Sequence, residues 1–317
     1  MTRLYSAYGL SIESELFCPE LPPSTAAPDV SFRLGTVAES LHQPTVRLPT
    51  LECEPGRHLL KLEQVAGARF LAQHGSEVIV HPVGESHPET LRLFLLSTCL
   101  AAILYQRGVV PLHANTIATK SGAVIIAGDS GVGKSTLSLA LMQRGYRILS
   151  DDLCAMTPNG EGEPTVQPGI PRLKLWADTL ERLVAPAAAR SRNGPDGSGL
   201  PSEGQRFERL RPELEKYALP LDGAFHEKPL PIRKLYLLRS TFEDRISLRH
   251  VTGARKFEAL RQHQFCYEYA NLFLERALLF DWLRTLAGRF PLAIVTRPSG
   301  SFRVAELADL MQEDIER

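Results

Sequence analysis

Short alternating runs of apolar and polar residues dominate the first part of the chain, and turn-forming residues separate them. Alternation with a period of two predicts half-buried β-strands, and proline-rich stretches such as residues 19–23 interrupt them. The pattern therefore predicts a small, mainly β domain over residues 1–86. The predicted strands cover residues 5–12, 30–34, 58–62, 69–72 and 77–81.

After His87 the apolar residues recur at helical spacing to about Gln106, and Gly108 follows the run. Its most apolar part, residues 91–105, contains Arg92 and is shorter than the stretch that crosses a bilayer. We therefore predict a buried helix there, and no membrane association.

A nucleotide-binding order of elements comes next. The apolar run at residues 123–127 is typical of a buried strand, and a glycine-rich loop, a helix over 135–144 and a strand over 146–149 follow it. We predict an α/β catalytic domain over residues 87–317. Residues 186–206 have almost no apolar side chains and predict a mobile loop. Further predicted elements are strands at 109–112, 116–118, 153–156, 232–238, 246–250 and 293–296, and helices at 256–289 and 304–315.

Composition narrows the class of partner and the location. Lys plus Arg and Asp plus Glu each total 36, so the formal net charge is zero and indicates no nucleic-acid partner. The N-terminal residues lack the apolar core of a signal peptide. Five dispersed cysteines without a C-x-x-C pair are typical of reduced thiols, so we expect a cytoplasmic protein.

Residues 128–135 read G-D-S-G-V-G-K-S and match every fixed position of the Walker A pattern. Backbone N–H groups of such a loop surround phosphate oxygens, Lys134 reaches the β- and γ-phosphates, and the Ser135 hydroxyl is a Mg²⁺ ligand. The motif predicts ATP and Mg²⁺ as cofactors. The predicted nucleotide contacts are Gly128, Asp129, Ser130, Gly131, Val132, Gly133, Lys134, Ser135 and Thr136.

Two adjacent carboxylates, Asp151 and Asp152, end the strand that follows the Walker A helix. Neighbouring side chains at a strand end point in different directions, so one can face Mg²⁺ while the other faces an acceptor hydroxyl. An ordinary acidic turn is the alternative. His113 follows a short apolar run, and taken alone such a histidine is more often structural; Cys154 is expected to be a packed core thiol.

Three segments together, L-H-A-N-T (112–116), G-D-S-G-V-G-K-S-T (128–136) and I-L-S-D-D (148–152), resemble the catalytic core of bacterial HPr kinase/phosphorylase. The resemblance implies a core related to phosphoenolpyruvate carboxykinase and phosphate transfer to a serine hydroxyl. It implies that Asp151 is the general base, Asp152 is a Mg²⁺ ligand and His113 assists near the phosphate. It also implies that a homo-oligomer can form.

The flanking sequence departs from that family. Thr136 stands where the family usually has glutamate, residues 168–176 (P-G-I-P-R-L-K-L-W) replace its Glu-rich signature, and its C-terminal Pro-Gly-Arg segment is absent. These departures argue against phosphorylase activity and against HPr as substrate. The motifs around residues 5–16, the R-L-K-L-W element and residues 229–238 instead resemble the HPr-kinase-like proteins of lasso-peptide biosynthesis, which phosphorylate a C-terminal serine of the precursor peptide.

The first hypothesis is therefore a Mg²⁺-ATP-dependent serine kinase acting on a peptide or small protein. The alternatives are an HPr-type protein kinase, a P-loop switch or NTPase, and a kinase for a small hydroxylated metabolite. The paired carboxylates favour transfer over a switch, which has little use for two. Arg172 and Lys174 alternate with leucines, so they could bind triphosphate or a peptide carboxylate from one face of a strand, or lie on a solvated face. Further cations that could stabilise the transferring group are Lys216, Arg233, Arg261 and Arg297.

Overall fold

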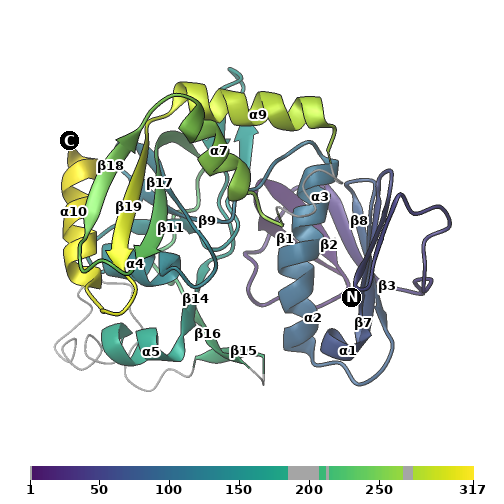
Figure 1. The fold of residues 1–317 in the computed structure, drawn as a ribbon. Coiled ribbons are helices and arrows are strands. Elements are labelled where there is room, and N and C mark those ends of the chain that lie inside the picture. The colour runs from purple at the N-terminus through teal and green to yellow at the C-terminus, as the bar shows by residue number, and fades with distance from the viewer. Residues whose placement is uncertain (1, 185–206, 212–213, 267–273) are drawn as a thin grey trace. The chain divides into compact units, whose positions relative to one another are not determined.

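The computed structural model describes residues 2–184, 207–211, 214–266 and 274–317, and the predicted mobile loop at 186–206 lies outside these ranges. The chain forms two compact units (Figure 1). The first comprises Met1–Pro111 and Phe265–Asp281, and the second comprises Leu112–Gln264 and Trp282–Arg317. The first unit thus extends beyond the predicted boundary at residue 86, because the helix at Pro88–Gln106 contacts the N-terminal sheet.

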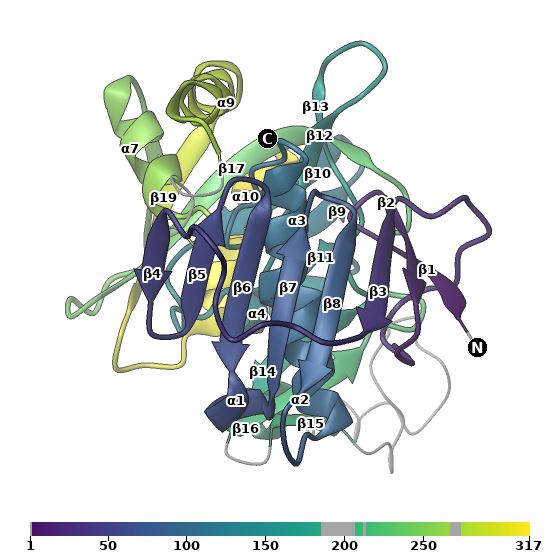
Figure 2. The ribbon, with the colours of Figure 1, turned by 90° about the vertical axis from the view of Figure 1, so that its right-hand side faces the viewer.

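An eight-stranded sheet in the order β1-β2-β3-β8-β7-β6-β5-β4 forms most of the N-terminal unit (Figure 2). This arrangement confirms the predicted mainly β character of the region. The short helix α1 (Glu63–Ala66) connects β6 to β7. The strands are β1 (Arg3–Ala7), β2 (Leu10–Ser14), β3 (Val30–Leu34), β4 (Val46–Leu48), β5 (Leu51–Glu54), β6 (Arg57–Leu62), β7 (Ala68–Gln73) and β8 (Glu77–Pro82).

The predicted single strand at residues 5–12 is a hairpin of β1 and β2. Its two turn residues, Tyr8 and Gly9, have φ values of 55° and 78°. Two consecutive residues in the left-handed conformation form the tight turn that connects two antiparallel strands. Of the two, only the glycine predicts this turn from the sequence. Tyr8 is a residue type that seldom adopts this conformation, so the alternating pattern concealed the turn.

The apolar segment after His87 is one helical run made of α2 (Pro88–Phe94), the π-helical turn η1 (Leu95–Cys99) and α3 (Leu100–Gln106). Over its 19 residues the run is long and apolar enough to cross a membrane, so the prediction that it is too short was wrong. The prediction of a buried helix is confirmed, since 67% of its apolar window is buried inside the protein. Its apolar face covers β7.

The second unit is an α/β domain around a mixed sheet in the order β11-β9-β10-β17-β13-β12, in which β19 also pairs with β17 and β18. The predicted α/β class is therefore confirmed. The strands of this sheet are β9 (Ala114–Thr119), β10 (Gly122–Ala127), β11 (Arg147–Ser150), β12 (Met156–Pro158), β13 (Pro164–Val166), β17 (Leu230–Thr241), β18 (Ser247–Val251) and β19 (Leu292–Pro298).

Strand direction explains why distant segments meet at one edge of this sheet. Strand β10 runs parallel to β17, and β9 lies antiparallel between β10 and β11. The carboxyl ends of β10 and β11 therefore share an edge with the start of β9. In open α/β sheets this edge is where ligands bind.

A helical layer covers the sheet beside that edge. Helix α4 (Lys134–Met142) packs on β9 and β11 and against α10 (Val304–Glu316). A buried cluster that includes Leu137, Leu141 and Met311 joins the helices to the sheet. The other elements of the unit include a small sheet in the order β14-β16-β15. They are β14 (Arg172–Trp176), α5 (Ala177–Thr179), η2 (Leu180–Val184), β15 (Glu208–Arg211), β16 (Leu214–Pro220) and α7 (Ala254–Gln262). Helix α9 (Arg276–Arg289) contains the boundary between the two units along the chain.

Candidate active site

The Walker A loop connects β10 to α4 with a backbone that glycine makes possible. Gly128, Gly131 and Gly133 have φ values of 156°, 80° and 105°. A Cβ atom on Gly128 would lie 2.6 Å from the carbonyl oxygen of Leu238, so no larger residue fits there without movement. Gly133 is the N-cap of α4, which directs the first N–H groups of the helix toward the loop.

Lys134 lies under this loop, with its ammonium group on backbone carbonyls. Its Nζ donates to the carbonyl oxygens of Gly128 (2.7 Å) and Asp129 (3.0 Å) and lies 3.0 Å from Nε2 of His113. Burial lowers the pKa of Lys134 to about 8, although Asp152 and Asp151 oppose the shift. The lysine thus needs a negatively charged ligand to hold its proton firmly.

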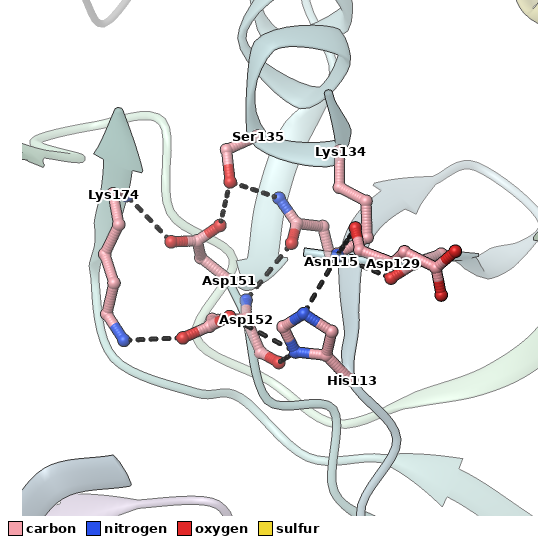
Figure 3. A network of polar contacts seen from close by, with 9 residues as sticks. His113, Asn115, Asp129, Lys134, Ser135, Asp151, Asp152 and Lys174 are labelled. Carbon is pink, nitrogen blue, oxygen red and sulfur yellow. Dashed lines mark hydrogen bonds and ion pairs between the residues drawn. The ribbon is translucent and has the colours of Figure 1, made fainter. Parts of the chain in front are cut away.

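His113 joins Lys134 to the paired carboxylates (Figure 3). Its Nδ1 lies 3.0 Å from the backbone oxygen of Asp152 and 3.3 Å from its Oδ1. Because the ammonium of Lys134 can only donate, Nε2 accepts, and the imidazole proton is on Nδ1, facing Asp152. Burial and the charge of Lys134 lower the pKa of His113, which keeps the ring neutral. His113 therefore has polar contacts both with Lys134 of the Walker A loop and with Asp152 of the carboxylate pair.

The two carboxylates point in different directions and have different neighbours. Asp151 is buried and accepts from the hydroxyl of Ser135 at 2.9 Å. Asp152 instead lines the pocket, beside His113. The reason lies in the backbone: Asp152 has a φ of 72°, a left-handed conformation that turns its side chain away from that of Asp151.

The charge states of the pair differ as well. Burial and the neighbouring charge of Asp152 raise the pKa of Asp151. Burial also acts to raise the pKa of Asp152, but Lys174 and His113 outweigh it and hold that pKa well below its usual range. Asp152 is therefore an ionised carboxylate at neutral pH. Asp151 is a buried carboxyl group whose pKa stays raised, because the charges of Lys174 and Lys216 do not outweigh its burial.

Lys174, in β14, contacts both carboxylates. Its backbone N–H donates to Oδ2 of Asp151 at 2.7 Å, and its Nζ donates to Oδ2 of Asp152 at 2.8 Å. The ion pair is largely buried, with 10% of the Lys174 side chain and 25% of the Asp152 side chain exposed. Sequence reasoning placed Lys174 among several candidate cations, and the contact of β14 with α4 brings it beside the carboxylates.

Asn115 is a site residue that sequence reasoning did not identify. Its Nδ2 donates to the hydroxyls of Ser135 (3.3 Å) and Ser138 (3.1 Å), and its Oδ1 accepts from the backbone N–H of Asp152 at 3.1 Å. Asn115 thereby holds the left-handed residue against the start of α4. The available signal was its spacing: it stands two residues after His113 and therefore points to the same side of an extended chain.

The pocket beside these residues has a volume of about 300 Å³. Among the predicted cations, Lys174, Lys216 and Arg297 line it, and Arg297 donates to the backbone oxygen of Val132 at 2.7 Å. Arg233 lines a different cavity, and Arg261 pairs with Glu258. Of the predicted loop residues, those on the pocket wall are Ser130, Gly131, Gly133, Lys134, Ser135 and Thr136. Cys154 is a core thiol, as predicted, and burial raises its pKa to about 12.

The residues at the loop suit a magnesium ion that is shared with a bound nucleotide. Within the described ranges, no group of three or more His, Cys, Asp or Glu side chains is placed to hold a metal ion by itself. Magnesium in phosphoryl-transfer sites typically has few protein ligands and takes the rest from phosphates and water. The hydroxyl of Ser135 and the buried carboxyl group of Asp151, 2.9 Å apart, fit that requirement.

Comparison with known proteins gives short matches to one family. No family model matches the chain. It is 43% identical over 44 residues to HPr kinase/phosphorylase of Treponema pallidum (strain Nichols), covering 14% of each chain. It is 37% identical over 70 residues to HPr kinase/phosphorylase of Lacticaseibacillus casei (strain BL23), covering 22% of this chain and 21% of that protein. The matches therefore span about a seventh to a fifth of the relatives' length, and they confirm the predicted resemblance over a short segment only.

Among solved structures, the Hpr(Ser) kinase/phosphatase from Coxiella burnetii is similar with a TM-score of 0.29 and 14% identity. The alignment covers 65% of this chain and 99% of that one. The topology described above, rather than this likeness, defines the fold of the present chain.

Proposed function

We propose that this protein is a Mg²⁺-ATP-dependent kinase that transfers the γ-phosphoryl group to a serine hydroxyl of a peptide or small protein. The observation that carries the proposal is the continuous set of contacts from Lys134 through His113 to Asp152. It places an ionised carboxylate beside a Walker A lysine in one pocket. A nucleotide-dependent switch has little use for this second carboxylate.

The chain's own residues supply binding, charge and proton transfer. The loop N–H groups and Lys134 hold the phosphates, and Lys134 leaves the carbonyls of Gly128 and Asp129 to do so. The oxygen of the acceptor hydroxyl bonds to the γ-phosphorus, and Asp152 accepts the proton of that hydroxyl. The bond between the γ-phosphorus and the oxygen that bridges it to the β-phosphate breaks. ADP is the leaving group. Neutral His113 positions Asp152 and Lys134 relative to each other.

The roles of the carboxylates in this proposal exchange those implied by the resemblance. Asp151 and Ser135 hold Mg²⁺, which neutralises charge on the phosphates when bound. Burial raises the pKa of Asp151 despite the charges of Lys174 and Lys216, so a further cation would relieve an existing cost. Asp152 is the carboxylate that lines the pocket, where an acceptor can reach it.

For the acceptor, we propose the C-terminal serine of a lasso-type precursor peptide. Support comes from the flanking motifs, including R-L-K-L-W, which the structure places in β14 beside the carboxylates. The departures at Thr136 and after Asp152 argue against HPr. We expect the protein to act in the cytoplasm, and no disulfide forms among the described residues.

Mass spectrometry after incubation with ATP and Mg²⁺ tests this function. Peptides with a C-terminal serine, matched peptides that end in alanine, and HPr serve as candidate acceptors. We expect phosphate on the serine-ended peptide only. Phosphate on HPr alone would instead indicate an HPr-type kinase, while ADP formation without any phosphorylated acceptor would favour a switch or NTPase.

Nucleotide affinity should depend on pH through Lys134. Its pKa of about 8 in the free protein means that the ammonium form, which binds phosphate, is lost as pH rises through that value. We expect the affinity for Mg²⁺-ATP to be nearly level from about pH 7 to 8 and then to fall by up to about tenfold per pH unit. Calorimetric titration at each pH measures this. In Lys134→Arg the charge persists at high pH, so any affinity that the variant retains should not show this decline.

A further inference from the structure

The lining of the pocket beside the Walker A loop contains two groups of residues with different chemistry, which we call its two ends. The first group is His113, Asp152 and Lys174, which contact one another where the proposed transfer takes place. The second group is Thr136, Thr179, Arg182, Phe302 and Leu307. All of these residues belong to the second unit, so the pocket is complete within it.

The Walker A loop sets the direction in which a triphosphate lies between these ends. The loop lysine contacts the β- and γ-phosphates, and the start of the following helix faces the α- and β-phosphates. The γ-phosphate is thus near Lys134 and Asp152, and the chain of phosphates proceeds toward Thr136. The hydroxyl of Thr136 lies 3.0 Å from that of Thr179, so whatever follows the α-phosphate reaches α5 and η2.

An aromatic ring paired with a cation occupies that end. The guanidinium carbon of Arg182 lies 4.9 Å from the centre of the Phe302 ring. Arg182 follows Thr179 by three residues, one helical turn, so both side chains face the same side. Phe302 nevertheless remains 39% exposed in the pocket wall, so its ring is accessible to a ligand.

A second aromatic–cation pair, Trp176 with Lys216 at 5.5 Å, lies toward the other end. Trp176 follows Lys174 by two residues in β14, and the charge of Lys216 acts on both Asp151 and Asp152. This pair therefore belongs with the carboxylates, which leaves Phe302 as the ring at the nucleoside end.

We propose that Phe302, with Arg182 against its ring, is the stacking site for the base of the bound nucleotide. The inference rests on the proposed function, because it takes the triphosphate on the Walker A loop as its starting point. It makes the donor a nucleoside triphosphate and excludes pyrophosphate or polyphosphate as the preferred donor. Stacking on a ring face tolerates different bases, so Phe302 confers affinity for a nucleoside without selecting adenine.

Binding measurements with two ligands test the inference without relying on activity. Calorimetry compares a non-hydrolysable ATP analogue with inorganic tripolyphosphate, both with Mg²⁺, on the full chain. Phe302→Ala should weaken the affinity for the ATP analogue by about five- to a hundredfold and leave the affinity for tripolyphosphate unchanged. Phe302→Tyr should keep most of the affinity, and Phe242→Ala, which removes a fully exposed ring outside the pocket, should change neither ligand.

Several results would overturn the stacking site. In Phe302→Ala they are an unchanged affinity for the ATP analogue, or an equal loss of affinity for both ligands. In Trp176→Ala it is a loss of affinity for the ATP analogue that Phe302→Ala does not show. In the unaltered protein it is tripolyphosphate binding as tightly as the ATP analogue. Failure of the proposed function would look different: no acceptor would be phosphorylated, whatever the behaviour of Phe302 in the binding measurements. Failure of the shared starting point, a triphosphate on the Walker A loop, would appear as normal tripolyphosphate binding by Lys134→Met.

Discussion

Replacing Asp152 by asparagine should lower the turnover number for phosphate transfer by about 10²- to 10⁴-fold, the usual contribution of a positioned general base. The amide keeps the shape of the side chain but cannot accept the acceptor's proton. Nucleotide affinity should change little, because Asp152 lies beside Lys174 and His113 rather than on the hydroxyl of Ser135. Steady-state kinetics with a serine-ended peptide and calorimetry with the ATP analogue measure the two effects separately.

Asp151→Asn is the matched control, because it makes the same chemical change one residue earlier. Its carboxyl group accepts from Ser135 and from the backbone of Lys174, so its loss should weaken binding of the nucleotide in the presence of Mg²⁺. The reverse outcome would restore the roles implied by the family resemblance. That outcome is an Asp151→Asn protein with normal Mg²⁺-nucleotide affinity and no transfer, next to an active Asp152→Asn protein.

Lys134→Met should lower kcat/KM by at least about 10²- to 10³-fold, since it removes a charge directed at the phosphates. Methionine has a similar length and needs no compensation for a buried charge, whereas Lys134 is buried on carbonyl oxygens. Methionine also leaves the carbonyl oxygens of Gly128 and Asp129 without this donor, so we expect the thermal unfolding midpoint to fall by no more than a few degrees while activity is lost.

Lys120→Met provides the comparison for this variant, because Lys120 is an exposed lysine of the turn between β9 and β10. It should leave both kinetics and unfolding unchanged. A Lys134→Met protein that loses activity because it unfolds at a much lower temperature would contradict the phosphate-binding role. So would one that binds tripolyphosphate as well as the unaltered protein does.

The local elements of the site were predictable from the sequence because each depends on neighbouring residues. The glycines of residues 128–133 predict a loop with positive φ values, and the apolar run before them predicts the buried strand β10. Gly145 predicts the end of α4, and its N–H donates to the carbonyl oxygen of Met142 there. Backbone sterics and helix capping act over a few residues, so a sequence pattern can reveal them.

The arrangement of the carboxylates was decided by the tertiary structure. The left-handed φ of Asp152 is not a feature that an Asp-Asp pair specifies, since this conformation costs roughly 1–2 kcal/mol in a residue other than glycine. Here the side chain of Asn115 and the ion pair with Lys174 hold it. Both partners come from other strands, 37 and 22 residues away in the chain.

The sequence by itself thus determined the glycine-rich loop between β10 and α4, the α/β class and the presence of acidic residues beside the loop. Tertiary structure alone decided which carboxylate meets Ser135, that Lys174 rather than another cation pairs with Asp152, and that the helix after His87 belongs with the N-terminal sheet. The physical reason is range. Backbone conformation follows from adjacent side chains, whereas strand order and direction are set by the burial of apolar faces and hydrogen bonding between distant segments.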